Sequence, residues 1–368
     1  MTNSDLREKL TDTLTLLGVP GVGRGRYNKL VSAFGSPERV LTASVAQLSA
    51  VPGISRSTAS AIREQNDPDK ARKSAARIVQ LGWRVTFLKD SDFPPLLKRI
   101  GDPPPVLFSE GDLLTPDDKL VAIVGTRHAS EGGRRYTHAL AGKLAEAGLI
   151  VVSGMAEGID AAAHKGALDA GGRTVAVWGT PLNLVYPPSN RELAERIKEK
   201  GLVYSEYLPE DQPSPSNFPE RNRIVSGLSE AVIVIEAGRK SGALITAHYC
   251  IEQGRELFAV PGPPYSPRSI GCNQLIKEGA RLLTDIDDLF NELPRLCSAV
   301  TAGKLKQTID LTDTERTLVD MLAQGPLQID QIARESGLPV AAILEYLLAL
   351  ELKGVVEELS GKRFALVQ

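Results

Sequence analysis

Cysteine is scarce in this sequence, since Cys250, Cys272 and Cys297 are the only three among 368 residues. No two of them, and no cysteine and histidine, have the spacing of zinc ligands, so we expect neither a metal site nor a disulfide framework. Apolar runs of about 18 residues are also missing, which argues against a membrane span. Because the first residues, MTNSD, read as the start of a charged helix rather than a signal peptide, we expect a cytoplasmic protein.

The formal net charge is only −2, so the protein is not expected to coat nucleic acid through bulk charge. The charge is nevertheless distributed unevenly. Residues 1–75 carry 11 Lys/Arg against 7 Asp/Glu, whereas residues 310–368 carry 5 against 10. A basic N-terminal segment and an acidic C-terminal segment therefore flank a nearly neutral middle.

The middle of the chain, residues 76–293, alternates short apolar runs with helical stretches. The runs VAIVG, LIVVSG, TVAVWG, VIVIEA and LFAVPG are rich in valine, isoleucine and leucine without a polar alternation, as in strands that are buried on both faces. Strands of this kind joined by helices indicate an α/β fold with a Rossmann-like, doubly wound parallel sheet.

Smaller units are predicted on either side of this core. Residues 1–75 read as short helices separated by the turns LGVPGVG and VPGIS, which is typical of a helix-hairpin-helix or SAM-like domain. Residues 294–309 have no clear period and are predicted to form a linker. Residues 310–368 contain three helical patterns followed by a hairpin that turns at Ser360-Gly361, which indicates a winged helix.

The core strands end in small residues followed by polar ones, as in Gly125-Thr126-Arg127 after VAIVG. In a doubly wound sheet, ligands bind at the carboxyl ends of the strands, where free amides and helix N-termini attract anions. A glycine lets the backbone approach a phosphate, and a guanidinium donates two hydrogen bonds to it. We therefore predict an anion site here. The alternative is that Gly125 only makes the turn and that Arg127 pairs with Glu131.

A second polar segment, FPERNR at residues 218–223, follows a loop rich in proline and serine. We interpret it as a turn that faces solvent or an anion, because two arginines and an asparagine are costly to bury. The alternative is an arginine braced by Glu220 or Glu236. The predicted DNA and phosphate site combines residues from all of these strand ends: Gly125, Thr126, Arg127, Gly154, Arg221, Asn222, Arg223, Lys240, Ser241 and Gly242.

Aromatic residues make up 5% of the chain. Trp178, Tyr186, Phe218 and Tyr265 are the ones best placed to stack on bases. Their scarcity favours phosphate contacts over stacking in any nucleic-acid site.

Neither a cofactor site nor a catalytic pair is predicted from the remaining motifs. The chain has neither G-x-G-x-x-G after its first strong strand nor a P-loop, so we expect no cofactor. In SGMAEGIDAAAHKGAL, Asp160 and His164 are one helical turn apart, a spacing that could serve acid/base chemistry or metal binding. With no third ligand nearby, the favoured interpretation is a pair that braces the helix.

Five motifs follow one another between about Phe93 and Asp288: VAIVGTR, SGMAEGIDAAAHKGAL, YPPSN, FPERNRI, and EAGRKSGALITAHYCIEQGRELFAVPG with GCNQLIKEGA. Their order resembles the DprA/Smf family of DNA-processing proteins. The resemblance implies a non-enzymatic protein of bacterial transformation that binds and protects single-stranded DNA and loads the RecA recombinase onto it.

The same resemblance implies a homodimer. The apolar segment that follows LFAVPG is the predicted dimer or partner surface, with the alternative that it packs internally. Its predicted contact residues are Ile270, Leu275, Ile276 and Leu282.

An enzyme of the lysine-decarboxylase-like phosphoribohydrolase type is the alternative function, because its Rossmann-like fold has a comparable glycine-rich segment. Such enzymes carry a catalytic glutamate in a PGGxGTxxE segment. The sequence EAGRKSG at residues 236–242 has no glutamate at the corresponding place. Binding without catalysis is therefore favoured.

The terminal domains carry separate predictions. Backbone amides of glycine-rich hairpins can bind phosphates, and Arg24, Arg26 and Arg56 lie beside the two N-terminal turns, so DNA and protein contacts both remain open. The third helix of the winged unit begins PVAA and lacks the polar or basic groups that read a major groove. A partner-binding or regulatory role is therefore favoured for that unit.

Overall fold

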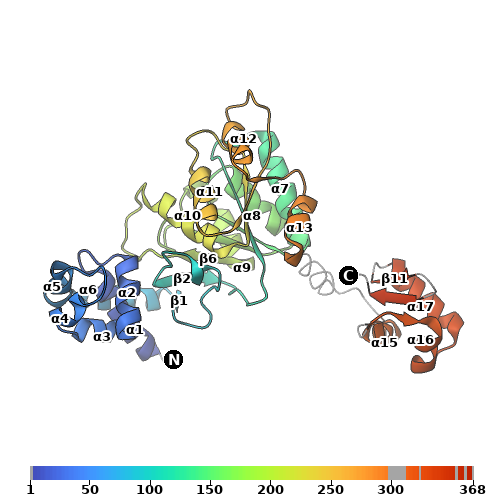
Figure 1. Cartoon of the computed structure of the whole chain (residues 1–368), viewed down its shortest axis with the longest axis horizontal. Helices are drawn as coiled ribbons and strands as arrows, with labels where there is room; N and C mark the ends of the chain where they lie inside the picture. The colour runs from blue at the N-terminus through green and yellow to red at the C-terminus, as the bar shows by residue number, and fades with distance from the viewer. Residues whose placement is uncertain (1–2, 297–311, 323–324, 353–354, 360–362, 367–368) are drawn as a thin grey trace. The chain divides into compact units, whose positions relative to one another are not determined.

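The computed structural model describes residues 3–296, 312–322, 325–352, 355–359 and 363–366. The chain divides into two compact units, with the boundary after Leu296 (Figure 1). Of the predicted linker 294–309, Pro294–Leu296 form a short 3-10 helix and the remainder lies outside the described residues, as does the predicted turn at Ser360-Gly361.

The N-terminal part of the first unit is helical, and its helix starts are set by short polar side chains. Ser44, Ser55 and Asp67 each accept a hydrogen bond from an amide in the following first turn. Gly21 and Gly53 have φ of +82° and +87°, which explains why glycine occupies the two predicted turns. The helices are α1 (Asn3–Leu17), α2 (Arg24–Phe34), α3 (Pro37–Thr42), α4 (Val45–Ser49), α5 (Arg56–Glu64) and α6 (Pro68–Gln80).

The described residues form a nine-stranded sheet in the order β1-β2-β6-β5-β4-β3-β7-β8-β9. The strands from β6 to β9 in this order pair in parallel, and β1 and β2 join antiparallel at one edge. The predicted α/β fold is confirmed, and the five predicted runs are β3, β4, β5, β7 and β8. The strands are β1 (Arg84–Phe87), β2 (Val106–Gly111), β3 (Leu120–Gly125), β4 (Ile150–Ser153), β5 (Thr174–Val177), β6 (Leu202–Ser205), β7 (Ala231–Ile235), β8 (Glu256–Ala259) and β9 (Arg281–Leu282).

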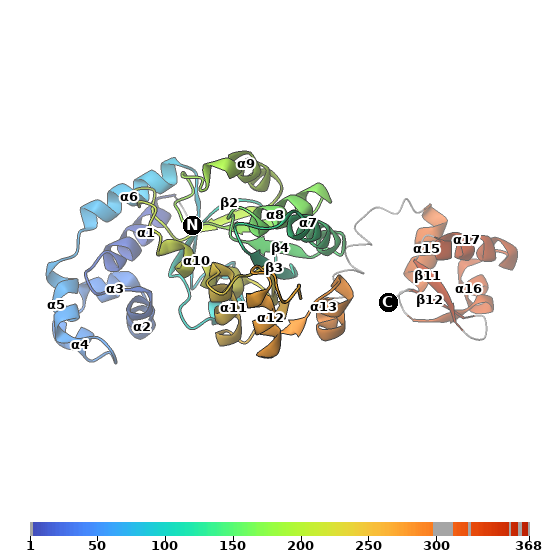
Figure 2. The same cartoon turned by 90° about the horizontal axis from the view of Figure 1, so that it is seen from above.

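Helices cover both faces of this sheet, as Figure 2 shows. On one face, Val225, Ala247 and Leu275 of α10, α11 and α12 belong to one buried apolar cluster with the strands. On the other face, α8 and α9 pack against the sheet, and α1 and α6 join the same cluster, so the predicted boundary at residue 75 falls inside a helix that contacts the core. The helices are α7 (Glu131–Glu146), α8 (Ile159–Asp169), α9 (Arg191–Lys200), α10 (Asn217–Leu228), α11 (Gly242–Glu252), α12 (Ile270–Lys277) and α13 (Ile286–Glu292).

The second unit is a winged helix, as predicted. Three helices and a small sheet in the order β10-β12-β11 surround one apolar cluster that includes Leu318, Ile332, Leu347 and Phe364. In the part of the chain that the structure describes, no helix is long and apolar enough to cross a membrane. The elements are α15 (Asp313–Leu322), β10 (Leu327–Gln328), α16 (Ile329–Ser336), α17 (Val340–Leu352), β11 (Val356–Leu359) and β12 (Arg363–Leu366).

Candidate nucleic-acid interface

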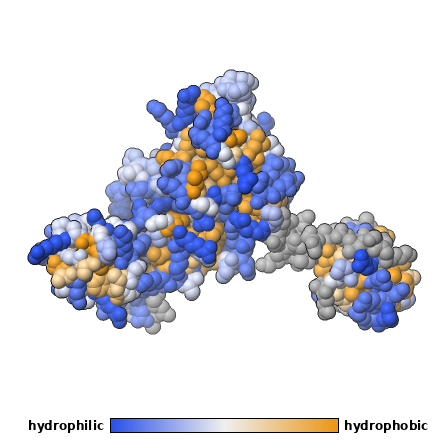
Figure 3. Space-filling model, viewed as in Figure 1, coloured by the Kyte–Doolittle hydropathy of each residue, from blue (hydrophilic) through white to orange (hydrophobic). Residues whose placement is uncertain are grey.

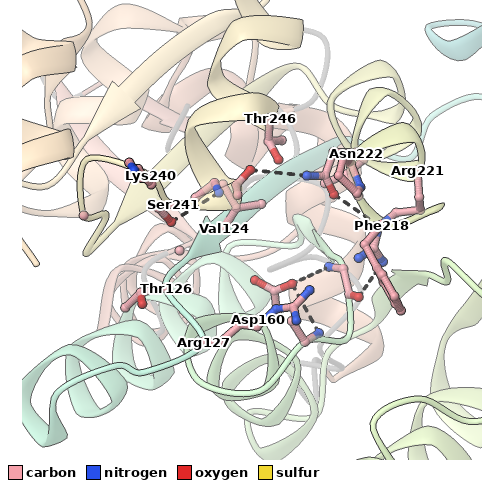
Figure 4. A pocket seen from close by; sticks show the side chains of 18 of the residues that line it. Val124, Thr126, Arg127, Asp160, Phe218, Arg221, Asn222, Lys240, Ser241 and Thr246 are labelled. Carbon is pink, nitrogen blue, oxygen red and sulfur yellow. Dashed lines mark hydrogen bonds between the residues drawn. The ribbon is translucent and has the colours of Figure 1, made fainter. Parts of the chain in front are cut away.

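A cavity of about 420 Å³ lies at the carboxyl ends of β3, β4 and β7 (Figure 4). The strand order reverses between β3 and β7, and such a reversal is where open α/β sheets bind ligands, because the connections diverge to either side. All of the predicted phosphate-site residues except Arg223 line this cavity. Asp160, Phe218 and Thr246 also line it.

Gly125 is required by the close approach of two strands. A Cβ at this position would lie 1.9 Å from the carbonyl oxygen of Ile235 and 2.5 Å from Cγ1 of Ile159. The next amide, of Thr126, donates to the carbonyl of Glu236 at 2.8 Å. Glycine therefore holds the ends of β3 and β7 together, and the chain turns into the cavity immediately afterwards.

Helices α7 and α11 both begin beside the ends of β3 and β7, and their N-termini differ in what occupies them. At the start of α7, the amide and hydroxyl of Ser130 donate to the Glu236 carboxylate at 2.8 and 2.5 Å. A carboxylate thus already occupies that helix terminus. At the start of α11, the hydroxyl of Ser241 accepts from the amide of Ala243 at 3.3 Å, and Gly242 faces the cavity. The positive end of the α11 dipole is therefore directed at the cavity.

Arg127 and Lys240 supply formal positive charge at the rim of the cavity, and both side chains are exposed. Within the described residues no ion pair neutralises either of them. The alternative pairing of Arg127 with Glu131 is wrong, because Glu131 pairs with Arg134 at 3.0 Å. The rim therefore presents two unneutralised cations to a ligand.

Arg221 forms the floor of the cavity and is buried, with only 4% of its surface exposed. Its guanidinium donates to the carbonyls of Gly154 and Val177. Burial lowers the pKa of Arg221 to about 10, although the Asp160 carboxylate opposes this shift. At neutral pH the side chain keeps its charge, but its hydrogen bonds already serve the protein.

The interpretation of residues 218–223 as a turn that faces solvent or an anion is correct only in part. The turn is wrong, whereas Phe218, Arg221 and Asn222 do line the cavity. These residues belong to the helix α10, and Arg223 is 3% exposed. Its guanidinium faces away from the cavity and donates to Glu206 at 2.5 Å. Both arginines can be buried because carboxylates from other elements compensate their charge. Asp160 does so for Arg221, and Glu206 does so for Arg223. Asn222 remains at the cavity, where its side-chain amide donates to the carbonyl of Gly242 at 3.3 Å.

An aromatic wall stands beside the charged rim. The ring of Phe218 lies 5.2 Å from that of Tyr186, and the guanidinium of Arg127 lies 5.5 Å from the Phe218 ring centroid. Tyr186 is 44% exposed, so the wall is accessible to a planar ligand. Unpaired bases stack on such rings, whereas the phosphates that flank them suit the cationic rim.

Asp160 and His164 do not brace each other. The Asp160 carboxylate accepts from the amides of Gly154 and Ala156 at 3.2 and 3.3 Å, and the Nδ1 of His164 bonds to the Thr174 hydroxyl at 2.7 Å. Burial, aided by the charge of Arg221, lowers the pKa of His164 to about 3, so this imidazole is neutral at physiological pH. The described residues contain no cluster of three metal-ligating side chains.

The three N-terminal arginines differ in their surroundings. Arg24 donates to Asp102 at 2.9 Å and to Glu220 at 3.2 Å, so it is engaged with the core and is not free for DNA. Arg26 donates to the carbonyl of Gly21 at 2.6 Å and is exposed, as is Arg56. DNA contact by Arg26 and Arg56 remains a prediction.

The four residues predicted for the dimer or partner surface differ in burial. Leu275 is 8% exposed and belongs to the core of the sheet, so the alternative of internal packing holds for it. Ile276 is partly buried against the same cluster, and Ile270 is also partly buried. Leu282, on the edge strand β9, is 48% exposed.

Comparison with known proteins agrees with these features. Residues 84–294 match the family model described as DNA recombination-mediator protein A. Residues 304–362 match the DprA winged helix domain, and residues 13–65 match a SAM-like helix-hairpin-helix tandem.

Curated relatives and solved structures give the same result. Protein Smf of Synechocystis is 38% identical over 311 residues, which are 75% of this chain and 78% of that protein. The crystal structure of DNA processing protein A from Streptococcus pneumoniae aligns with this protein at a TM-score of 0.67 and 34% sequence identity. The alignment covers 79% of this chain and 98% of the Streptococcus pneumoniae chain. DNA processing protein A from Helicobacter pylori, described for its single-stranded DNA binding mode, has a TM-score of 0.53 at 31% identity, with coverages of 58% and 96%. The protein is therefore a member of the DprA/Smf family of DNA-processing proteins.

Proposed function

We propose that this protein binds single-stranded DNA in the cavity at the carboxyl ends of β3, β4 and β7. One observation carries the proposal: a charged rim and an aromatic wall lie side by side. Arg127 and Lys240 form the rim next to the open N-terminus of α11, and Phe218 and Tyr186 form the wall. Cations and helix amides bind the phosphates, and the rings stack on unpaired bases. The relative from Helicobacter pylori, described for its single-stranded DNA binding mode, supports this proposal.

The proposed role does not include catalysis at this site. Of the described residues that line the cavity, Asp160 is the one acid, and its carboxylate accepts two backbone amides beneath Arg221. Glu236, at the neighbouring strand end, accepts two hydrogen bonds from Ser130. Neither carboxylate is free to act on a nucleotide, which weakens the alternative of a phosphoribohydrolase.

The finer role is that of a mediator that protects single-stranded DNA during transformation and loads the RecA recombinase onto it in the cytoplasm. Family membership supports this role. A homodimer that uses the edge strand β9 fits the exposure of Leu282, and hydrophobic residues reach the surface of this unit between hydrophilic ones (Figure 3). We expect Leu282→Glu to shift the full-length protein from dimer to monomer in light-scattering measurements.

Fluorescence anisotropy of a labelled oligo-dT tests the binding proposal with the full-length protein. We expect Arg127→Ala to weaken binding by about 1 to 3 kcal/mol, because a charge-assisted phosphate contact is lost. Arg135→Ala removes a charge that is also exposed, from α7 outside the cavity, and serves as the matched control. Equal losses in the two variants would contradict the proposed site. Release of free base from nucleoside monophosphates would revive the enzymatic alternative.

A further inference from the structure

Helix α10 presents different residues to two sides of the molecule. Phe218, Arg221 and Asn222 line the cavity. Glu220 and Arg223 are three residues apart and therefore lie on one helical face. Glu220 pairs with Arg24 of the N-terminal helices, and Arg223 pairs with Glu206, which follows β6. Because one helix carries both faces, a contact with the second face also constrains the position of the residues that line the cavity.

Among the described residues, Arg24 at the start of α2 is the N-terminal side chain that pairs with this second face. Its guanidinium lies 3.2 Å from Glu220, 2.9 Å from Asp102 and 3.7 Å from Glu206. Arg223 lies 2.5 Å from Glu206 and 3.8 Å from Asp102. Two arginines thus face three carboxylates, and removing Arg24 would leave three carboxylates around one arginine.

The part of α10 that Arg24 contacts is its first turn, which has no side-chain cap. Ser216 precedes the helix in an αR conformation and makes no side-chain capping hydrogen bond. Uncapped first turns fray, because their amides have no partner within the helix. Several contacts hold this turn from outside. The Tyr207 hydroxyl donates to the Asn217 carbonyl at 3.2 Å, Phe218 packs against Gly179 and Tyr186, and Arg24 pairs with Glu220.

Phe218 belongs to this same turn. Its ring packs closely against Gly179, where an added Cβ would lie 2.9 Å from Phe218 Cδ1, so the ring tolerates little displacement before the wall beside Tyr186 changes. The position of the aromatic wall therefore depends on a turn that a side chain of the N-terminal helices helps to hold.

We propose that Arg24 is a positioning residue for single-stranded DNA binding: it holds the first turn of α10 so that Phe218 stays in place at the cavity, without contacting DNA itself. This inference rests on the proposed function of the cavity. It also gives the N-terminal helical domain a role at the site that does not require DNA contacts of its own.

The test is anisotropy of the full-length protein with a short labelled oligo-dT. Arg24→Met removes the charge and keeps much of the side-chain volume. We expect a loss of affinity of about fivefold, which corresponds to about 1 kcal/mol. Arg39→Met, which removes an exposed charge from α3 of the same domain, is the matched control and should change affinity less than twofold.

The salt dependence separates positioning from direct contact. A lost phosphate contact lowers the slope of log affinity against log salt by about one, whereas a positioning residue leaves that slope unchanged. Glu220→Gln alone should also weaken binding, and the double variant Arg24→Met/Glu220→Gln should lose less than the sum of the two single losses, because both act through one pair. Denaturant unfolding confirms that each variant is folded under the conditions of the titration.

Arg127→Ala separates a failure of the proposed DNA-binding site from a failure of the positioning role of Arg24. If Arg127→Ala has no effect, the proposed function fails. If Arg127→Ala weakens binding while Arg24→Met does not, the positioning role of Arg24 fails and the proposed function stands. A reduced salt slope in a folded Arg24→Met variant would show direct DNA contact and would overturn the inference.

Discussion

The guanidinium of Arg127 lies over the ring of Phe218, 5.5 Å from its centroid. Arg127 follows β3, whereas Phe218 lies in the first turn of α10, which precedes the neighbouring strand β7. Stacking on the ring restricts the long arginine side chain without neutralising it. A nucleotide that enters the cavity therefore meets a cation and an aromatic ring that are already oriented together.

Phe218→Leu should weaken single-strand binding by about 1 to 3 kcal/mol, the usual contribution of one base stacked on an aromatic ring. The slope of affinity against salt should stay unchanged, because leucine removes no charge. Anisotropy over a salt series measures both quantities. A reduced slope would mean that the substitution disturbs the phosphate contacts rather than stacking.

Arg223→Met should destabilise the protein by about 3 to 5 kcal/mol, because it removes the partner of a buried carboxylate. The Glu206 side chain is 8% exposed, and its Oε1 has no hydrogen-bond partner among the described residues. The double variant Arg223→Met/Glu206→Leu should recover much of the loss, since no buried charge then remains at this pair. Chemical denaturation of the single and double variants measures the free energies of unfolding, and a double variant less stable than Arg223→Met would refute the assignment.

His164 should make the free energy of unfolding depend on pH. Burial lowers its pKa to about 3 in the folded state, whereas an unfolded histidine titrates near 6.5. Below pH 6.5 the unfolded chain binds a proton that the folded protein excludes, so stability falls by about 1.4 kcal/mol per pH unit as the pH drops toward 3.

The measurement is denaturant unfolding of the wild type and His164→Asn between pH 7 and pH 5. Asparagine retains a donor for the Thr174 hydroxyl but does not titrate. The wild type should lose stability more steeply than the variant. Parallel pH profiles would contradict a buried neutral histidine.

Deletion of residues 310–368 should leave single-strand affinity within about threefold, under 1 kcal/mol. This segment carries 5 basic against 10 acidic residues, and α17 begins with four apolar residues, so it repels phosphate and offers no bidentate donor at that terminus. The preceding unit is compact by itself. A tenfold loss with an unchanged oligomeric state would show that the wing contacts DNA through the exposed Arg363, or through Lys353 or Lys362, which lie outside the described residues.

The sequence predicted the parallel strands and the residues at their ends because both signals are local. Continuous valine and isoleucine runs identify buried strands, and glycine marks the place where β3 meets β7. Helix α10 was missed because Pro219 follows a loop rich in proline and serine, yet proline is tolerated in a first helical turn, where its missing amide has no intrahelical role.

The burial of Arg221 and Arg223 could not be predicted from local pattern. Each arginine is compensated by a carboxylate from another element, Asp160 on α8 and Glu206 after β6. The same holds for Arg24, which looks like a free cation beside a glycine turn but is paired with residues far along the chain. Charge compensation across elements depends on the tertiary fold rather than on spacing in the sequence.

The most direct test of the account is a crystal structure of the full-length protein bound to oligo-dT. We predict a backbone phosphate within hydrogen-bond distance of the Gly242 or Ala243 amide and of Arg127, with an unpaired base against the ring of Phe218. Arg24 should keep its contact with Glu220 and make none with DNA. DNA bound elsewhere, with this cavity empty, would contradict the central claim.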